Sequence, residues 1–322
     1  MTIGIVHLGA SSLSLALVDQ NLHNLQILQD KRQRLANGER KQQTYDQLLN
    51  SILEVFELAE QLQLLQQISA LIVTSPTPVT WPHGRVGLCP GMPALKDRPL
   101  LSDIQTKIAG KYGISPRVLV ENDANAAAIQ WALQSEEGDK PHFHCRLSTG
   151  VGGCIMWGGQ PYRGHCSLAG EIGHVTIQPF GLLCGCGNVG CLETVCGGNA
   201  LQRMYAEIAG NKQTHFMDLL DQWQTESIDL SLQLELMGKY LGIAIASATN
   251  LLNPAFVVVS GPLLDARDVL RHSLESEFSQ RVCASLECPL MFAAADHNDP
   301  FHAGVAVYRN WQSQQPPHVI HN

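Results

Sequence analysis

The fold is decided by the stretch IGIVHLGASSLSLALVD at residues 3–19. Its two largely apolar runs, joined by the small residues 9–12, predict a β-hairpin. Apolar residues then recur at helical spacing from 45 to 65, and residues 69–74 form a short apolar run typical of a buried strand. The chain therefore opens with strand, strand, helix and strand, an order that indicates an α/β domain.

A second hairpin is expected where residues 145–148 and 152–157 flank the glycine-rich stretch 149–153. Strands and helices alternate after it, with helices at 201–208, 232–252, 266–278 and 303–311 and strands at 256–260 and 290–293. The sequence thus predicts two α/β domains, residues 1–140 and 141–322, with a final helix that packs back on the first domain.

Two segments of the first half point to a functional site. Residues 75–100, the proline loop, are too rich in proline for regular structure, and we expect this loop to cover a site. A strand at 117–120 runs directly into an alanine-rich helix at 122–134. Residues 121–123 are therefore expected at an edge of the sheet, where the strand ends.

The charge balance excludes some classes of function. With 21 Lys and Arg against 29 Asp and Glu, the 322 residues carry a net charge of -8, which offers no field to attract nucleic acid or anionic lipid. A composition of 45% apolar and 16% charged residues fits a chain with a large core. No apolar run reaches the ~18 residues of a membrane span, and the N-terminus lacks a signal-peptide pattern. We expect a cytoplasmic protein that binds neither nucleic acid nor membrane.

The cysteines are clustered. His174, Cys184, Cys186 and Cys191 form the pattern H-x9-C-x-C-x4-C. Three thiolates and one imidazole make a closed tetrahedral set that suits a structural Zn2+ ion and disfavours magnesium or calcium. The alternative is a glycine-rich loop with incidental reduced thiols.

Other cysteine and histidine positions are interpreted as structural. Cys196 is expected in the core. His142, His144 and Cys145 have strand-like spacing and no fourth ligand, which indicates an ordinary edge strand.

Acidic residues supply the candidates for chemistry. Asp123 can accept a proton from a substrate hydroxyl that Asn122 orients, and the alternative is that one of the two residues only caps the following helix. Glu171, His174 and Glu193 lie in and beside the cysteine cluster. Held rigid by zinc, they would suit recognition of several sugar hydroxyls, and the alternative is that the acids are merely solvated.

Five motifs occur in order along the chain: ENDANAAA at 121–128, TGVGG at 149–153, YRG at 162–164, AGEIGH at 169–174 and CGCGNVGCLET at 184–194. Together they resemble the ROK family of repressors, open reading frames and sugar kinases, and the similarity extends to DPFHAGVA at 299–306. The resemblance implies an actin-like, hexokinase-type (ribonuclease H-like) α/β fold of two domains, with sugar and ATP in the cleft between them.

The same resemblance implies roles for single residues. Asp123 would be the catalytic base, and the sugar would be held by Asn122, Glu171, His174 and Glu193. His174 would also bind zinc with the three cysteines. In a kinase, ATP and Mg2+ would be accommodated by Gly9, Ala10, Ser11, Thr149, Gly150, Gly152 and Gly261.

Family resemblance also bears on partners. A homodimer is expected, with a small-molecule sugar as ligand. The repressor branch carries an N-terminal helix-turn-helix domain, and because this chain begins directly at the first hairpin we expect no DNA-binding module.

The chain departs from the family pattern on the phosphate side. Kinases of the family open with Asp-x-Gly-Gly-Thr, whereas residues 7–11 here read HLGAS. A histidine cannot replace a carboxylate near hydrated magnesium, and Ala10 adds a methyl group where glycine lets a phosphate approach. Ser148 and Cys154 flank a glycine loop that is usually richer in glycine, and the SGP sequence at 260–262 replaces a Gly-Gly-Gly stretch near the nucleotide. On the sugar side the departure is Gly91, which takes the place of an asparagine.

The sequence therefore favours an ATP-dependent kinase that phosphorylates a hexose or an N-acetylated amino sugar. The alternative is a sugar-binding regulator that has lost phosphoryl transfer. Retention of Asp123 favours the kinase, and the changes at His7, Ala10 and Ser11 favour the regulator. A zinc-dependent hydrolase is disfavoured, because all four zinc positions would be filled by protein ligands.

Overall fold

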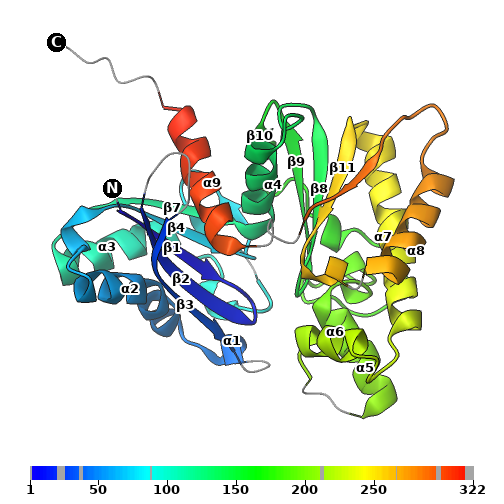
Figure 1. Cartoon of the computed structure of the whole chain (residues 1–322), viewed down its shortest axis with the longest axis horizontal. Coiled ribbons are helices and arrows are strands. Elements are labelled where there is room, and N and C mark those ends of the chain that lie inside the picture. Colours follow the sequence, from blue (N-terminus) through cyan, green and yellow to red (C-terminus); the bar gives the residue numbers. More distant parts are fainter. Residues whose placement is uncertain are drawn as a thin grey trace.

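The structure is a computed structural model that describes residues 2–19, 26–35, 39–87, 89–210, 214–265, 267–294 and 299–315. Two five-stranded sheets stand side by side, each with helices packed on it (Figure 1). The strand order is β3-β2-β1-β4-β7 in the first sheet and β10-β9-β8-β11-β12 in the second. Each sheet therefore begins with an antiparallel hairpin and continues with parallel strands.

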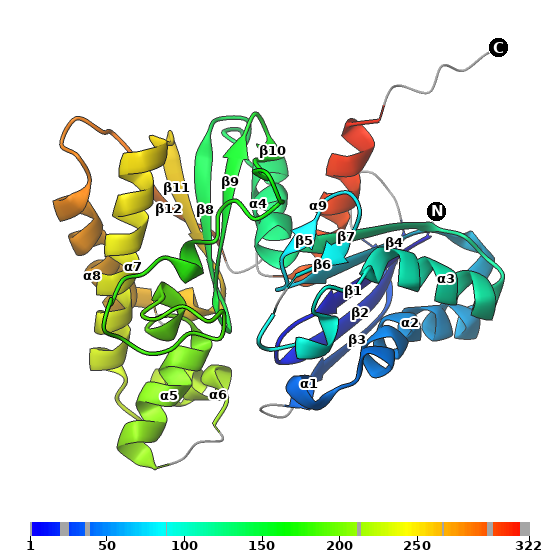
Figure 2. The same ribbon diagram turned by 180° about the vertical axis from the view of Figure 1, so that it is seen from behind.

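The first sheet is formed by β1 (Thr2–Leu8), β2 (Ser12–Asp19), β3 (Gln26–Arg34), β4 (Ile68–Ser75) and β7 (Arg117–Asn122). Side chains of β1 alternate between its two faces, as in any strand. Val6 and Leu8 pack under α2 (Tyr45–Gln61) and α3 (Leu100–Tyr112), which lie together on one face (Figure 2). Ile3 and Ile5 face the opposite side and pack against α4 (Asp123–Gln134) and α9 (Pro300–Ser313).

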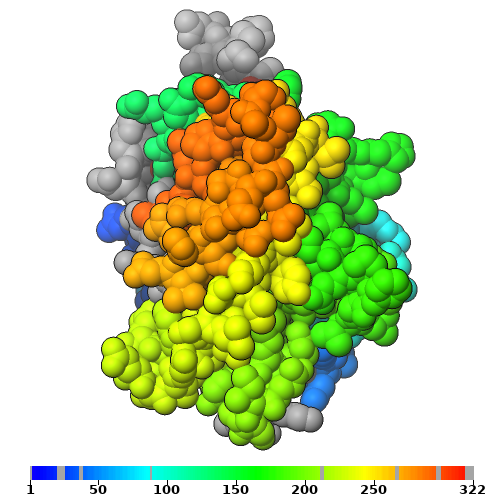
Figure 3. All heavy atoms as spheres, turned by 90° about the vertical axis from the view of Figure 1, so that its right-hand side faces the viewer, coloured from blue at the N-terminus to red at the C-terminus, as the bar shows by residue number. Residues whose placement is uncertain are grey.

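The second sheet is formed by β8 (His142–Leu147), β9 (Val151–Trp157), β10 (Gln160–Pro161), β11 (Phe256–Ser260) and β12 (Leu290–Phe292). Its outer face is covered by α7 (Ser231–Leu252) and α8 (Arg267–Arg281), which form much of the surface in Figure 3. The helices α5 (Gly198–Ala209) and α6 (Phe216–Gln224) complete this core near the ends of the strands.

The helix α4 joins the two halves. It begins at the end of β7, packs against α9, and also packs against β8 and β9 of the second sheet. The helix α9 comes from the C-terminal part of the chain but lies on β1 and β4 of the first sheet, where Phe301 is buried. The two sheets are thus linked by packed helices at one end and can frame a cleft at the other.

Most elements lie where the sequence predicts them, and four expectations are corrected. The strand β3 and the helix α6 were not expected. The proline loop contains a short ribbon, β5 (Val79–Thr80) with β6 (Arg85–Val86), and a 3-10 turn, η2 (Pro93–Leu95). The edge-strand interpretation of residues 142–145 is wrong, because β8 is hydrogen-bonded on both sides, to β9 and to β11.

Histidine in the middle of a sheet is accommodated by specific partners. His142 and His144 are each 1% exposed. The His142 ring stacks on Phe256 and its Nδ1 lies 2.9 Å from the Lys140 carbonyl oxygen, while His144 Nε2 lies 2.7 Å from Ser260 Oγ. Within the described ranges no helix is both long enough and apolar enough to cross a bilayer.

Candidate functional site

A cleft of about 540 Å3 lies between the two halves and is lined by residues of both. The first half contributes residues 9–12, here called the phosphate turn, and parts of the proline loop. The second half contributes the glycine-rich loop 148–153 and the neighbourhood of the cysteine cluster. Asp123, at the junction of β7 and α4, opens into the same cleft.

The end of β7 shows which of the two neighbouring residues, Asn122 or Asp123, caps α4. Asn122 is the N-cap of α4, and its Oδ1 accepts hydrogen bonds from the backbone N–H groups of Ala124 (2.9 Å) and Asn125 (3.2 Å). Its Nδ2 donates to the Thr77 carbonyl oxygen at 3.1 Å, which leaves one N–H for a ligand. Because Asn122 caps the helix, the Asp123 carboxylate takes no part in the cap and is available to a substrate.

A buried ion pair fixes this strand end. The Glu121 side chain has no exposed surface, and its Oε1 accepts from the backbone N–H of Asn122 (2.9 Å) and from Asn125 Nδ2 (3.0 Å). Arg163 donates to both Glu121 oxygens, at 3.2 and 2.7 Å. The charge of the buried carboxylate is thus matched by a bidentate guanidinium, the geometry that stabilises such a pair best.

Arg163 also ties the proline loop to the second half. Its guanidinium lies over the Trp81 ring, 4.4 Å from the centroid, and the Trp81 backbone N–H donates to Ser167 Oγ at 3.2 Å. These contacts position the proline loop, parts of which line the cleft.

Three carboxylates, those of Asp123, Glu171 and Glu193, line one part of the cleft, here called the sugar side. Burial raises the pKa of Glu171, and although the nearby His174 opposes this shift, the charges of Glu193 and Asp123 add to it. Glu193 Oε2 accepts from the Val151 backbone N–H at 3.2 Å and thereby holds the glycine-rich loop. A group of acceptors in this arrangement suits a ligand with several hydroxyl groups.

Glycine is required where this loop meets Glu193. A Cβ at Gly150 would stand 2.1 Å from Glu193 Oε2. A Cβ at Gly152 would stand 2.8 Å from the Cβ of Ala124, in the first turn of α4. The sequence TGVGG therefore lets the loop approach both the sugar side and the start of α4.

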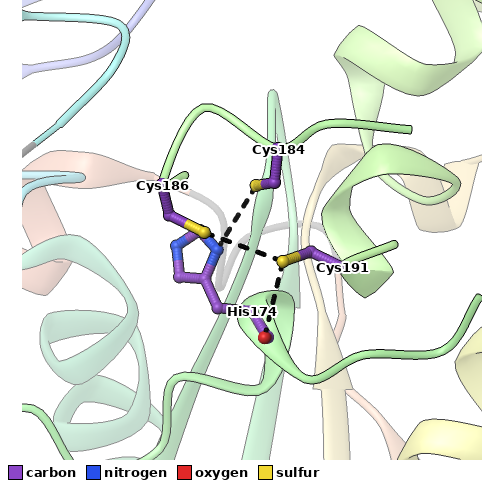
Figure 4. Close-up of side chains that lie close together, drawn as sticks. All are labelled: His174, Cys184, Cys186 and Cys191. Atoms are coloured by element: carbon purple, nitrogen blue, oxygen red, sulfur yellow. Dashed lines mark hydrogen bonds between the residues drawn. The ribbon is translucent and has the colours of Figure 1, made fainter. Parts of the chain in front are cut away.

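The four residues predicted to bind metal are brought together (Figure 4). One candidate ligand atom from each of His174, Cys184, Cys186 and Cys191 lies within 4.8 Å of the others. Cys184 Sγ is 3.7 Å from His174 Nδ1, and Cys186 Sγ is 3.7 Å from Cys191 Sγ. Soft thiols with one imidazole fit a tetrahedral Zn2+ ion, and these two separations are close to those between ligand atoms on one such ion.

His174 belongs to the cysteine cluster and also lies beside Glu171 of the sugar side. His174 turns Nδ1 toward the cysteines, while its Nε2 lies 3.9 Å from Glu171 Oε2. A metal ion on Nδ1 would therefore fix the ring that neighbours Glu171. Cys196 is not part of the cluster; it is 1% exposed and its Sγ donates to the Met237 carbonyl oxygen at 3.2 Å.

The phosphate turn is held from behind by Arg40, in the short helix α1 (Glu39–Gln42). The Arg40 side chain is 2% exposed. Its Nε donates to the Gly9 carbonyl oxygen (3.2 Å) and its Nη2 to that of Ser12 (2.7 Å). Burial lowers the pKa of this guanidinium to about 10, so it remains charged at neutral pH.

His7 stands beside this turn where the family resemblance calls for an aspartate. Burial lowers its pKa to about 4, against the opposing charge of Asp123, and Arg146 and Arg40 lower it further. The ring is therefore neutral at pH 7, with Nδ1 3.0 Å from Thr74 Oγ1. A neutral imidazole does not supply the hard anionic oxygen that Mg2+ prefers, so this position does not fit a magnesium site.

Contacts between the halves close the cleft at the phosphate turn. Ser11 Oγ lies 3.4 Å from Thr149 Oγ1 and 3.0 Å from His215 Nε2. An exposed ion pair, Arg34 to Asp218 at 2.6 Å, spans the same junction. His215 was not expected in the site. It lies directly before α6, a helix that was not among those expected from the sequence.

All but one of the predicted sugar and nucleotide residues line the cleft. The exception is Gly261, where a Cβ would stand 1.9 Å from the Leu147 carbonyl oxygen and where φ is +112°. Gly261 therefore allows β11 to leave the sheet close to β8, and Pro262 next to it lines the cleft instead. Gly91 also lines the cleft, and a Cβ placed on it would have Ala10 Cβ and Cys89 Sγ as its nearest neighbours, at 3.6 and 3.8 Å.

Sequence comparison identifies relatives along nearly the whole chain. The ROK family profile matches residues 2–306. The xylose repressor of Bacillus subtilis is 28% identical over 217 residues, which cover 64% of this chain and 56% of the repressor. The glucokinase of Streptomyces coelicolor is 30% identical over 197 residues, covering 55% of this chain and 61% of the glucokinase. The chain therefore matches little more than half the length of these relatives.

A longer match joins this chain to the N-acetyl-D-glucosamine kinase of Pasteurella multocida, 24% identical over 88% of this chain and 91% of the kinase. Among solved structures, a ROK glucokinase from Streptomyces griseus in complex with glucose and AMPPNP superposes with a TM-score of 0.78 at 20% identity, covering 96% of this chain and 99% of that one. The ROK hexokinase of Thermus thermophilus gives 0.70 at 23% identity, with 97% and 100% covered. The expected actin-like, hexokinase-type fold is confirmed.

Proposed function

The chain belongs to the ROK family, and from that premise we propose that it phosphorylates a hydroxyl group of a hexose or an N-acetylated amino sugar, with Asp123 as the general base. One observation carries the proposal: Asn122 caps α4, so the Asp123 carboxylate remains available in the cleft between the sugar side and the phosphate turn. The glucokinases and N-acetyl-D-glucosamine kinases among its relatives support this substrate class.

In the proposed reaction, Glu171 and Glu193 accept hydrogen bonds from sugar hydroxyls and orient the sugar. The reacting hydroxyl gives its proton to an Asp123 carboxylate oxygen while its own oxygen forms a bond to the terminal phosphorus of ATP. The bond from that phosphorus to the bridging oxygen breaks, and ADP leaves. Charge on the transferred group is balanced by the phosphate turn with Arg40 behind it and by Arg146 in the wall of the cleft.

A second candidate is a sugar-binding regulator that transfers no phosphoryl group. The neutral His7 favours it, because the carboxylate expected near magnesium is missing. The repressors among the relatives also support a regulatory role.

Sugar-dependent ADP release across a panel of hexoses and N-acetylated amino sugars, measured beside sugar binding by calorimetry, separates the two candidates. Release that requires one sugar of the panel supports the kinase. Tight binding of a sugar with no release in the presence of ATP supports the regulator and refutes the kinase.

We propose further that the cysteine cluster holds one structural Zn2+ ion. The support is the Cys3His donor set with all four candidate atoms within 4.8 Å of one another. Metal analysis of the purified protein tests this: about one zinc per chain is expected, and a protein free of zinc yet fully folded would contradict it.

A homodimer is the last part of the proposal. Large apolar side chains are exposed around the cysteine cluster, at Phe180, Leu182, Leu183 and Val189. Exposed apolar groups gathered on one loop are typical of a protein contact. Sedimentation at several concentrations tests this, and a monomer at every concentration would contradict it.

A further inference from the structure

We propose that the phosphate side of this cleft binds a phosphoryl group through cations of the protein and without a divalent metal ion. This inference rests on the proposed function only in that the ligand of the cleft carries a phosphoryl group. The ligand class is a phosphate ester or anhydride: a nucleotide, a sugar phosphate or an inorganic polyphosphate.

The first support is a buried charge whose hydrogen-bond partners are neutral. Besides the two backbone carbonyls of the phosphate turn, Arg40 donates to Gln43 Oε1 at 2.8 Å. Glu39, its neighbour on α1, acts on it through charge. Among the described residues, no carboxylate accepts a hydrogen bond from this guanidinium. A buried charge without a bonded counter-ion is unfavourable, and an anion on the other side of the turn would stabilise it.

The second support is the orientation of the turn. The Gly9 carbonyl oxygen points at Arg40, so in the planar trans peptide the N–H of Ala10 points away from it. Ala10 lines the cleft. Arg40 therefore both places positive charge behind the turn and fixes the direction of a backbone donor in front of it.

The third support is the distribution of charge around the turn. Arg146, half-buried on β8, lines the cleft, and the charge of Asp123 acts on it. Lys41 is exposed at the mouth of the cleft and has no carboxylate partner in the described part of the chain. Two further arginines of the rim are already paired: Arg32 with Asp299 at 2.8 Å, and Arg34 with Asp218.

The fourth support is His7. Metal-dependent phosphate sites place a carboxylate near the phosphate, and that carboxylate repels the phosphate unless a cation lies between them. A neutral imidazole causes no such repulsion. With His7 in this position, the phosphate meets one carboxylate fewer, and the charges of Asp123 and Asp299 nearby are opposed by Arg40 and Arg146.

Calorimetry on the full chain tests this with three probes: ADP, N-acetylglucosamine 6-phosphate and tripolyphosphate, each in excess EDTA and in excess MgCl2. We expect at least one probe to bind in EDTA, with a Kd that changes by less than about twofold on adding magnesium. The probe that binds best identifies the source of the phosphoryl group. If no probe binds, or if every probe binds at least about tenfold more weakly in EDTA, the proposal is overturned.

Two variants locate the effect. Arg40→Gln should weaken metal-free binding by about tenfold, whereas Arg85→Gln, which removes the same charge from an exposed residue outside the cleft, should leave it unchanged. His7→Asp places a carboxylate beside the turn, and the hydrogen bonds of Arg40, which go to backbone carbonyls of the turn, do not involve the side chain at position 7. It should weaken metal-free binding by about tenfold and make binding magnesium-dependent. Unchanged metal-free affinity in a folded His7→Asp protein would overturn the proposal.

The outcome is independent of turnover. Metal-free phosphate binding without ADP release leaves the inference standing and removes the kinase. ADP release together with strictly magnesium-dependent ADP binding leaves the kinase standing and removes the inference.

Discussion

The two sides of the cleft differ in charge and in how closely they follow the family. The sugar side gathers Asp123, Glu171 and Glu193 beside a cysteine cluster that keeps the ROK motif. The phosphate side has lost its expected aspartate and is backed by the buried charge of Arg40. Within one fold, the two halves of a binding site can therefore depart from the family pattern independently of each other.

The physical reason lies in what holds each side. Glu171 and Glu193 lie beside the four candidate metal ligands, and Glu193 also accepts a hydrogen bond from the glycine-rich loop, so a change there would disturb several contacts at once. The phosphate turn is held by Arg40 through backbone carbonyl oxygens, and by the Ser11 hydroxyl, which contacts Thr149 and His215 of the second half. The Ala10 side chain can therefore change without loss of these hydrogen bonds.

The largest expected effect is the loss of turnover when the proposed general base on the sugar side is replaced. Asp123→Asn keeps the shape of the side chain and removes its basicity, so sugar-dependent ADP release should fall by about 10²–10⁴-fold while sugar affinity changes by less than about twofold. Asp268→Asn, on the exposed surface of α8, is the matched control and should change neither. An Asp123→Asn protein with normal turnover would rule out this residue as the general base.

The next effect concerns the rigidity of the sugar side. Cys186→Ser should release the metal and lower the melting temperature by about 5–10 °C, because several kcal/mol of metal binding are lost from the folded state. Sugar affinity should fall with it. Cys283→Ser, at an exposed thiol far from the cluster, is the control. Equal melting temperatures for the two variants would show that the cluster does not support the fold.

A smaller effect is expected when the family residues are restored on the phosphate side, at positions 7 and 10. His7→Asp combined with Ala10→Gly restores a carboxylate for magnesium and closer approach of phosphate, so ADP release in magnesium should rise by about tenfold if the chain is a kinase. His7→Asn combined with Ala10→Gly is the matched control without the charge. A restored protein no faster than this control would mean that the altered turn does not limit turnover.

The smallest effect concerns Gly91, the departure on the sugar side. Its neighbours leave room for a side chain, so Gly91→Asn should add one hydrogen bond to the sugar and tighten binding by about two- to tenfold. Gly91→Ala adds the same Cβ without the amide and should leave the affinity unchanged. Calorimetric titration of both variants checks this, and equal affinities would mean that the amide does not reach the sugar.

Elements with a buried face were predictable from the sequence. The strands of both hairpins and the helices α2, α4, α7 and α9 carry apolar residues at the period of their structure. The strand β3 does not: its sequence QILQDKRQR is almost entirely exposed at the edge of the first sheet, so no alternation marks it. The helix α6 spans 9 residues, and its buried Phe216, Leu219 and Leu220 do follow helical spacing, so the sequence carried a short signal that the prediction missed.

Site residues that belong to a local sequence motif could be predicted. The roles of residues that act through partners far away along the chain could not. The metal ligands follow from their spacing, and the structure brings all four together. Arg40 lies in no motif, and its partner Ser12 is 28 residues away along the chain, so the sequence did not mark it. Arg163 lies in the YRG motif at 162–164, but its role was not predicted, because its partner Glu121 is 42 residues away.

The most direct test of a metal-free phosphate side beside an Asp123-centred sugar side is a crystal structure with the tightest-binding sugar and ADP, grown in EDTA. We expect a sugar hydroxyl about 2.6–3.2 Å from an Asp123 carboxylate oxygen, other hydroxyls on Glu171 and Glu193, and the ADP phosphates against the phosphate turn with no metal between. A sugar bound away from Asp123 would contradict the role of Asp123, and phosphates absent from the turn would contradict the metal-free phosphate side.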